Sequence, residues 1–114
     1  MRAPPAVGED QAVRWFRALG DKTRLRIIER LRDGEESVGH LAAVLATGQS
    51  RLSFHLKALR DAGLVRDRHQ GRLTYYALDL AAFRAIAQFL EAVETRRGRP
   101  AGCQEASGPA LELP

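Results

Sequence analysis

The side chains with the clearest chemical potential lie between positions 49 and 57, where hydroxyl, amide and basic groups are interspersed with leucines. Leu52, Leu56 and Leu59 recur at helical spacing, so they define one face of a helix and turn the polar groups to the other. Hydroxyl and amide groups can hydrogen-bond base edges, and basic groups can bind phosphates or guanine. We therefore predict that this helix contacts the major groove of DNA through Gln49, Ser50, Arg51, Ser53, Phe54, His55 and Lys57.

Phe54 and His55 have narrower roles in this set. The Phe54 side chain cannot form hydrogen bonds, so we expect it to contact a thymine methyl group. His55 lies beside the leucine stripe, and packing or phosphate contact suits it better than metal binding. The three histidines of the chain, His40, His55 and His69, show no metal-ligand spacing, so the sequence does not predict a zinc site.

A second group of candidate DNA contacts is expected at the tip of a β-hairpin. The β-prone runs 64–69 and 73–78 flank a turn that contains Gly71. Arg68, Gln70 and Arg72 would then reach the DNA backbone or a narrow minor groove, with His69 beside them. Residues 49–76 hold six Lys and Arg against two Asp, which accounts for the whole net charge of +4. This concentration favours phosphate binding over a merely solvated hairpin, and it predicts an affinity that falls with salt.

Helical periodicity predicts the scaffold for these groups. Helices are expected at about 10–19, at about 22–32 after an Asp21 N-cap, from a Ser37 cap to Leu45, at about 49–62 and at about 80–96. The first two helices have apolar stripes at Val13, Phe16 and Leu19, with Trp15 alongside, and at Leu25, Ile28 and Leu31, with Ile27 widening the second. A short helix, a tight turn, a longer helix, a hairpin and a closing helix predict a mainly α winged helix-turn-helix domain of order α-α-α-α-β-β-α.

The last helix carries an apolar stripe of Phe83, Ile86, Leu90 and Val93, with Phe89 on a second edge. The stripe is wider than a small core needs, so part of it is expected between two chains. We interpret residues 1–9 as an arm, 10–97 as the DNA-binding and dimerisation domain, and 98–114 as a flexible tail. One cysteine, Cys103, and the lack of a membrane span or signal peptide predict a cytoplasmic protein.

Two stretches resemble the ArsR/SmtB family of metalloregulators. ALGDKTRLRIIERL (18–31) is similar to the second-helix signature of that family, and GQSRLSFHLKALRDAGLVRDRHQGRLTYYALD (48–79) is similar to its recognition helix and wing. The resemblance covers roughly residues 10–95. It implies a homodimer formed through the first and last helices, so that Trp15 and Phe16 join the dimer set. It also implies an inverted-repeat operator and repression that an inducer relieves.

The metal sites of this family are not matched. Ser37-Val38-Gly39 stands where metal-sensing members have a cysteine box, and residues 80–97 contain no histidine. Cys103 falls where some arsenic-responding relatives carry cysteines, but soft ions bind two or three thiolates. For the inducer, the open alternatives are a trivalent arsenical or an oxidant acting through Cys103 and a ligand lodged between the helices of the dimer. Cys103 is otherwise an ordinary exposed thiol. No other cofactor or metal is expected.

Two other classes of function compete with a DNA-binding repressor. A winged helix can serve as a protein-interaction module without operator binding, because a fold does not dictate its function. An enzyme is not expected, because the sequence offers no nucleophile and base pair, no phosphate-binding glycine loop and no metal cluster. The Glu35-Glu36 pair is interpreted as serving a helix dipole rather than acid–base catalysis.

Overall fold

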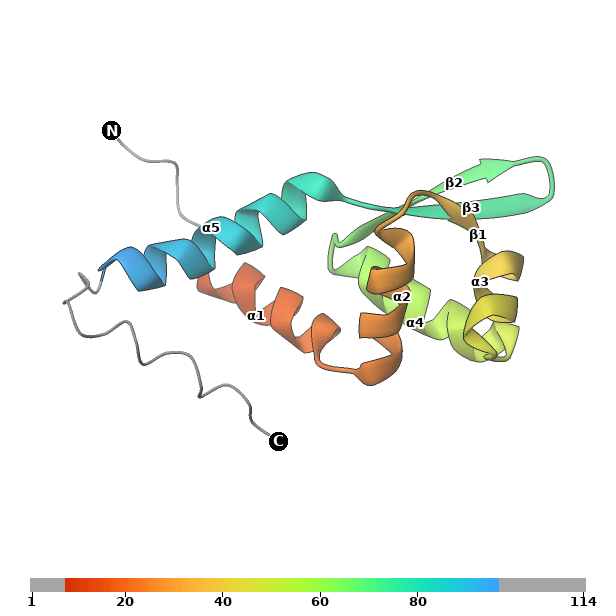
Figure 1. Ribbon diagram of the computed structural model, residues 1–114, viewed down its shortest axis with the longest axis horizontal. Coiled ribbons are helices and arrows are strands. Elements are labelled where there is room, and N and C mark those ends of the chain that lie inside the picture. The colour runs from red at the N-terminus through yellow and green to blue at the C-terminus, as the bar shows by residue number, and fades with distance from the viewer. Residues whose placement is uncertain (1–7, 97–114) are drawn as a thin grey trace.

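The computed structural model describes residues 8–96 (Figure 1). Its helices are α1 (Glu9–Leu19), α2 (Lys22–Leu31), α3 (Val38–Leu45), α4 (Gln49–Asp61) and α5 (Leu80–Arg96). Its strands are β1 (Glu36–Ser37), β2 (Val65–Gln70) and β3 (Leu73–Leu78). The predicted winged helix-turn-helix order is confirmed. Helix α1 begins at the last residue of the predicted arm, and the predicted tail, with Cys103, lies outside the described residues.

The two predicted N-caps form as expected. Asp21 Oδ1 accepts hydrogen bonds from the amides of Thr23 and Arg24 at 2.8 and 3.1 Å. Ser37 Oγ accepts one from the amide of His40 at 3.2 Å. Each cap satisfies backbone N–H groups that have no partner inside the helix, so these two residues define where α2 and α3 begin.

The turn between α3 and α4 is built around a left-handed residue. Ala46 has φ 53° and ψ 47°, and its amide bonds back to the carbonyls of Ala42 and Ala43. This conformation costs an alanine about 1–2 kcal/mol relative to right-handed backbone. It stops α3 abruptly, so that α4 can start at Gln49 after a turn of only three residues.

The sheet contains a strand that the sequence did not predict. The hairpin of β2 and β3 is confirmed, and β1 pairs antiparallel with the far edge of β3, which gives the order β1-β3-β2. In this pairing Glu36 faces Tyr76 and Ser37 faces Tyr75. A strand of two residues shows no alternation of its own, so only the neighbouring β3 reveals it.

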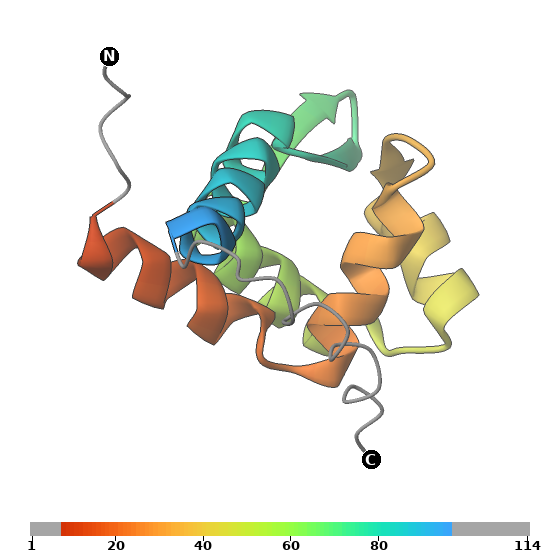
Figure 2. The same cartoon turned by 60° about the vertical axis from the view of Figure 1, so that its left-hand side comes forward.

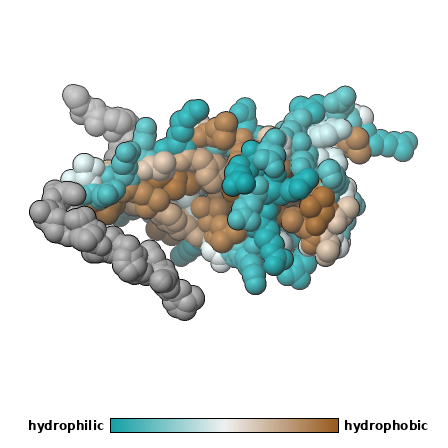
Figure 3. Space-filling model, viewed as in Figure 1, coloured by the Kyte–Doolittle hydropathy of each residue, from teal (hydrophilic) through white to brown (hydrophobic). Residues whose placement is uncertain are grey.

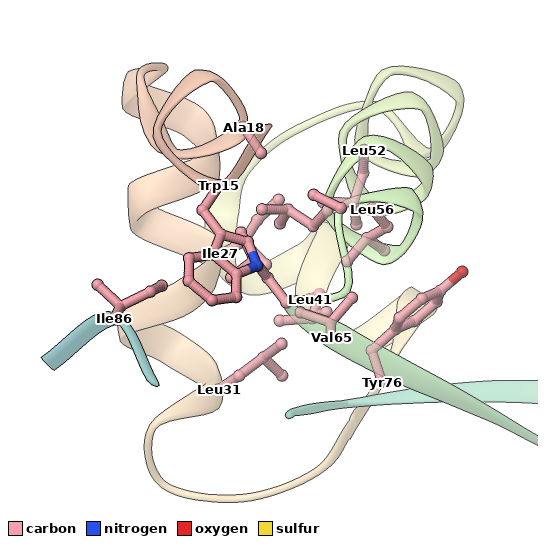
Figure 4. Packing of buried hydrophobic residues seen from close by; sticks show 13 residues of the cluster. Trp15, Ala18, Ile27, Leu31, Leu41, Leu52, Leu56, Val65, Tyr76 and Ile86 are labelled. Atoms are coloured by element: carbon pink, nitrogen blue, oxygen red, sulfur yellow. The ribbon is translucent and has the colours of Figure 1, made fainter. Parts of the chain in front are cut away.

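The core gathers residues from every helix and from the hairpin (Figure 4). Its fully buried side chains are Ile27, Leu41, Leu52, Leu56, Leu59 and Leu64. The Trp15 side chain points into the same cluster and is only 6 % exposed, and Ile86 reaches it from α5. Trp15 and Ile86, which we predicted to contact a second chain, are therefore corrected to core residues of their own chain.

The predicted stripes of the first two helices are right for Leu19, Ile28 and Leu31, which lie in or against the core, and wrong for their exposed members. Helix α1 buries Ala12, Trp15 and Ala18, while Val13 and Phe16 are exposed. Helix α2 buries Ile27 and Leu31, while Leu25 is 49 % exposed. Both helices carry apolar residues on more than one face, and periodicity does not tell which face the rest of the chain covers.

Candidate nucleic-acid interface

Helix α4 has one buried face and one free face. Leu52, Leu56 and Leu59 are fully buried and anchor the helix on the core. The opposite side exposes nearly all the residues predicted to read DNA, namely Gln49, Ser50, Arg51, Ser53, Phe54 and Lys57. We call this set the reader face.

Phe54 is the most exposed large apolar side chain of the described residues, at 63 %. Its only aromatic neighbour within the described chain is His55, with ring centroids 5.3 Å apart in an edge-on arrangement. The guanidinium of Arg24 lies 6.0 Å from its ring centroid. The ring is therefore available to an apolar group outside the chain, such as a thymine methyl.

His55 does not lie on the reader face, and its predicted contact with DNA is corrected. The imidazole is 6 % exposed, and its Nδ1 accepts a hydrogen bond of 3.0 Å from Arg24 Nε. The carboxylate of Asp21 lies 4.0 Å from the same nitrogen, and Arg24 also donates to the carbonyl of Ala18. His55 thus joins α4 to the junction of α1 and α2. Of its two predicted roles, packing and phosphate contact, its position fits packing.

Burial lowers the pKa of His55 below its ordinary value of 6.5, since the charged imidazolium would lose its hydration. Asp21 opposes this shift, and Arg24 and Arg51 reinforce it. The neutral ring then accepts from Arg24 through Nδ1 and carries its proton on Nε2.

The lowered pKa predicts how stability depends on pH. Below about pH 6.5 the unfolded chain binds a proton at His55 more readily than the folded chain does, so the free energy of unfolding should fall as the pH drops from 7 toward 5. Urea unfolding at a series of pH values measures this slope. A His55→Asn variant keeps an acceptor for Arg24 but cannot titrate, and it should show a shallower slope. An unchanged slope would contradict the assignment.

The wing, defined as β2, β3 and their turn, projects beyond the core. Gln70 pairs with Leu73 across a two-residue turn, and Gly71 takes φ 65° there, which suits glycine. Arg72 follows Gly71 at the tip and is exposed. Figure 1 shows the wing tip and the start of α4 at the same end of the molecule, with α1 and most of α5 toward the other end.

The six basic side chains of residues 49–76 fall into two groups. Three are held in ion pairs: Lys57 Nζ with Asp61 at 3.2 Å, Arg60 with Asp67 at 3.0 Å, and Arg68 with Glu35 at 2.8 Å. Within residues 8–96, no ion pair is found for Arg51, Arg66 or Arg72. Of the predicted DNA contacts, Arg51 and Arg72 therefore lie at the surface without an acidic partner among the described residues.

Sequence reasoning missed the contacts of Glu35 and Arg24, because each residue contacts a partner about thirty positions away.

An apolar surface lies at the opposite end, where α1 and the later part of α5 approach each other (Figures 1 and 2). Phe16 and Phe89 bridge the two helices, with ring centroids 6.0 Å apart. Around them, Val13 is 46 %, Leu90 53 % and Val93 56 % exposed. Figure 3 shows hydrophobic side chains gathered over these helices. Phe83 is half-buried and packs against the core. We call Val13, Phe16, Phe89, Leu90 and Val93 the apolar end.

No helix in the part of the chain that the structure describes could cross a membrane. No cluster of three or more His, Cys, Asp or Glu side chains suited to a metal ion occurs between residues 8 and 96.

Comparison with known proteins connects this geometry to a group of relatives. Residues 21–67 match the family model described as bacterial regulatory protein, arsR family. The HTH-type transcriptional regulator CmtR of Mycobacterium tuberculosis is 40 % identical over 109 residues, which cover 92 % of each chain. The arsenical resistance operon repressor of Escherichia coli is 40 % identical over 67 residues, covering 58 % of this chain and 57 % of the relative.

A solved structure matches the whole fold. The homodimeric winged helix-turn-helix DNA-binding domain Mb0332 of Mycobacterium bovis, a possible ArsR-family regulator, superposes with a TM-score of 0.62 at 30 % identity. The match covers 80 % of this chain and 87 % of the other.

Proposed function

This chain belongs to the arsR family of bacterial regulatory proteins, and we propose that it represses transcription by binding an inverted-repeat operator as a homodimer. As a member of that family it is a DNA-binding transcriptional regulator and not an enzyme. The observation that carries the proposal is the reader face and wing tip at one end of the chain, with an uncovered apolar surface at the other. Such a regulator acts in the bacterial cytoplasm, where the DNA is.

The DNA contacts divide by chemistry. Gln49, Ser50 and Ser53 would hydrogen-bond base edges or the backbone, and Phe54 would contact a thymine methyl. Arg51 and Arg72 would neutralise phosphates, whereas Lys57 is already paired with Asp61. The start of α4 adds backbone N–H groups and the positive end of its dipole, because the N-cap is Gly48 and makes no side-chain cap bond. Base contacts then give specificity, and phosphate contacts give most of the affinity.

The apolar end supports the homodimer. Its exposed Val13, Phe16, Leu90 and Val93 and its half-buried Phe89 are of the kind that protein interfaces bury, and the Mb0332 relative is homodimeric. Pairing two chains through α1 and α5 would leave both reader faces free. A two-fold protein then matches a two-fold operator, with half-sites about one helical turn apart.

The experiment that tests the function is a fluorescence anisotropy titration with the chain's own upstream DNA and with a random duplex of the same length. Specific binding should be about 10³-fold tighter or more. Phe54→Ala should reduce that ratio, whereas Arg72→Ala should weaken both duplexes alike and lower the salt slope by about 1. Equal affinity for the two duplexes would refute operator binding and favour a protein-interaction module. An in vitro transcription assay then separates repression from activation.

Release of the operator by an inducer is proposed to involve Cys103, through a trivalent arsenical or an oxidant. A ligand held between the helices of the dimer is the alternative. Arsenite or peroxide should release the wild-type protein from DNA and should not release a Cys103→Ser variant. If both proteins respond alike, the thiol has no part in induction; if neither responds, the inducer belongs to another chemical class.

A further inference from the structure

Arg68 makes several contacts within its own chain. Its Nε and Nη2 donate to the two carboxylate oxygens of Glu35 at 2.9 and 2.8 Å, and its Nη1 donates to Gln70 Oε1 at 2.7 Å. The guanidinium also stacks over the ring of Tyr75, 4.6 Å from the centroid. Each of the three nitrogens and one face of the group therefore has a partner, although the side chain is 48 % exposed.

These contacts cross the whole sheet. Arg68 stands on β2, directly opposite Tyr75 on β3, and Tyr75 in turn pairs with Ser37 of β1. Glu35 immediately precedes β1 and, by strand alternation, shares a face with Ser37, Tyr75 and Arg68. The side chain of Arg68 thus links the outer strand of the wing to the segment that leads into α3, the first helix of the helix-turn-helix.

The positive charge of Arg68 is neutralised locally by the carboxylate of Glu35. The hydrogen bonds from Arg68 lower the pKa of Glu35, so the carboxylate is ionised at neutral pH. A DNA phosphate placed on Arg68 would also meet that carboxylate and be repelled by it. Arg72, two residues beyond Gln70, has no acidic partner among residues 8–96 and faces no such conflict.

We propose that Arg68 is not a phosphate ligand but a positioning residue, which with Glu35 and Tyr75 sets the direction of the wing relative to the helix-turn-helix, so that Arg72 reaches the backbone. The inference rests on the proposed DNA binding and corrects the role that the sequence suggested for Arg68. The inference also gives Glu35 an indirect, favourable part in DNA binding, although an acidic residue near DNA ordinarily weakens the affinity.

Salt dependence separates the two roles, because each phosphate neutralised by the protein adds about 0.9 to the slope of log affinity against log salt. The probe is a random duplex, so no operator needs to be known. Arg72→Ala should lower the slope by about 1. Arg68→Ala should weaken binding severalfold with the slope unchanged. A slope lowered equally by both variants would overturn the proposal.

For the Glu35→Gln variant, the positioning role and simple electrostatics predict opposite changes in DNA affinity. Loss of one negative charge by itself should strengthen DNA binding, and Asp33→Asn, an exposed site two residues earlier, measures that effect. If Glu35 positions the wing, Glu35→Gln binds more weakly than Asp33→Asn. The double variant Glu35→Arg with Arg68→Glu should recover affinity relative to Arg68→Glu alone. A Glu35→Gln variant that binds more tightly than Asp33→Asn, or a double variant without recovery, would overturn the proposal.

Amide hydrogen exchange in the absence of DNA tests the positioning directly. Exchange in β2 and β3 should be faster in Arg68→Ala and Glu35→Gln than in the wild type, and unchanged in Arg72→Ala. This readout does not depend on DNA binding. If the wild type fails to bind an operator, only the proposed function fails; if wing exchange does not respond, the positioning role fails.

Discussion

A Leu90→Glu variant should dissociate to monomers and lose operator affinity by about a hundredfold or more. Leu90 belongs to the apolar end and is 53 % exposed in the single chain, so the substitution leaves the core intact. In the dimer it would bury a carboxylate without a partner, which costs several kcal/mol. A monomer has one reader face and loses the gain of about 10²–10⁴ that two linked contacts provide. Analytical ultracentrifugation and an operator titration measure the two effects.

The matched control is Gln88→Glu, which adds the same charge to an exposed position on the opposite side of α5. That variant should remain dimeric and bind the operator nearly as the wild type does. A dimeric Leu90→Glu protein would show that the two chains do not meet through the apolar end. A monomeric Leu90→Glu protein with full operator affinity would show instead that the second chain is not needed for binding.

Replacing Ile27 by alanine should lower the free energy of unfolding by about 2–5 kcal/mol. Ile27 is fully buried in the cluster that also holds Leu52 and Leu56, so its truncation leaves a cavity beneath the reader helix. That loss is a large part of the 5–15 kcal/mol that a domain of this size usually has. Urea unfolding followed by circular dichroism, at one protein concentration for all variants, measures it.

Leu25→Ala is the control on the same helix. Leu25 is 49 % exposed, and its truncation should cost less than about 1 kcal/mol. The comparison tests which of these two predicted stripe residues faces the core, since the structure buries Ile27 and exposes Leu25. If Leu25→Ala were as destabilising as Ile27→Ala, α2 would pack with the other face inward.

The charges of this protein have two distinct roles. The excess of positive charge in residues 49–76 draws the chain to DNA in general, but half of those basic groups are occupied by Asp61, Asp67 and Glu35. Arg60 joins α4 to β2, and Arg68 joins β2 to the residue that precedes β1. A count of basic residues therefore overstates the number of phosphate contacts, and the measured salt slope should be smaller than the count suggests.

The sequence by itself determined the order and type of the elements other than β1, and it determined which face of α4 is left exposed. These follow from local rules. Asp21 and Ser37 cap helices within three residues of themselves, Gly71 permits a tight turn, and three leucines in α4 are spaced so that only one face can be buried.

Only the tertiary structure decided which of several apolar or charged residues faces which partner. Trp15 and Phe16 are neighbours of similar chemistry, yet one lies in the core and the other at the apolar end. His55 lies against Arg24, thirty-one positions away, and Glu35 lies against Arg68, thirty-three positions away. Local periodicity carries no information about such distances, because the packing of the whole chain sets them.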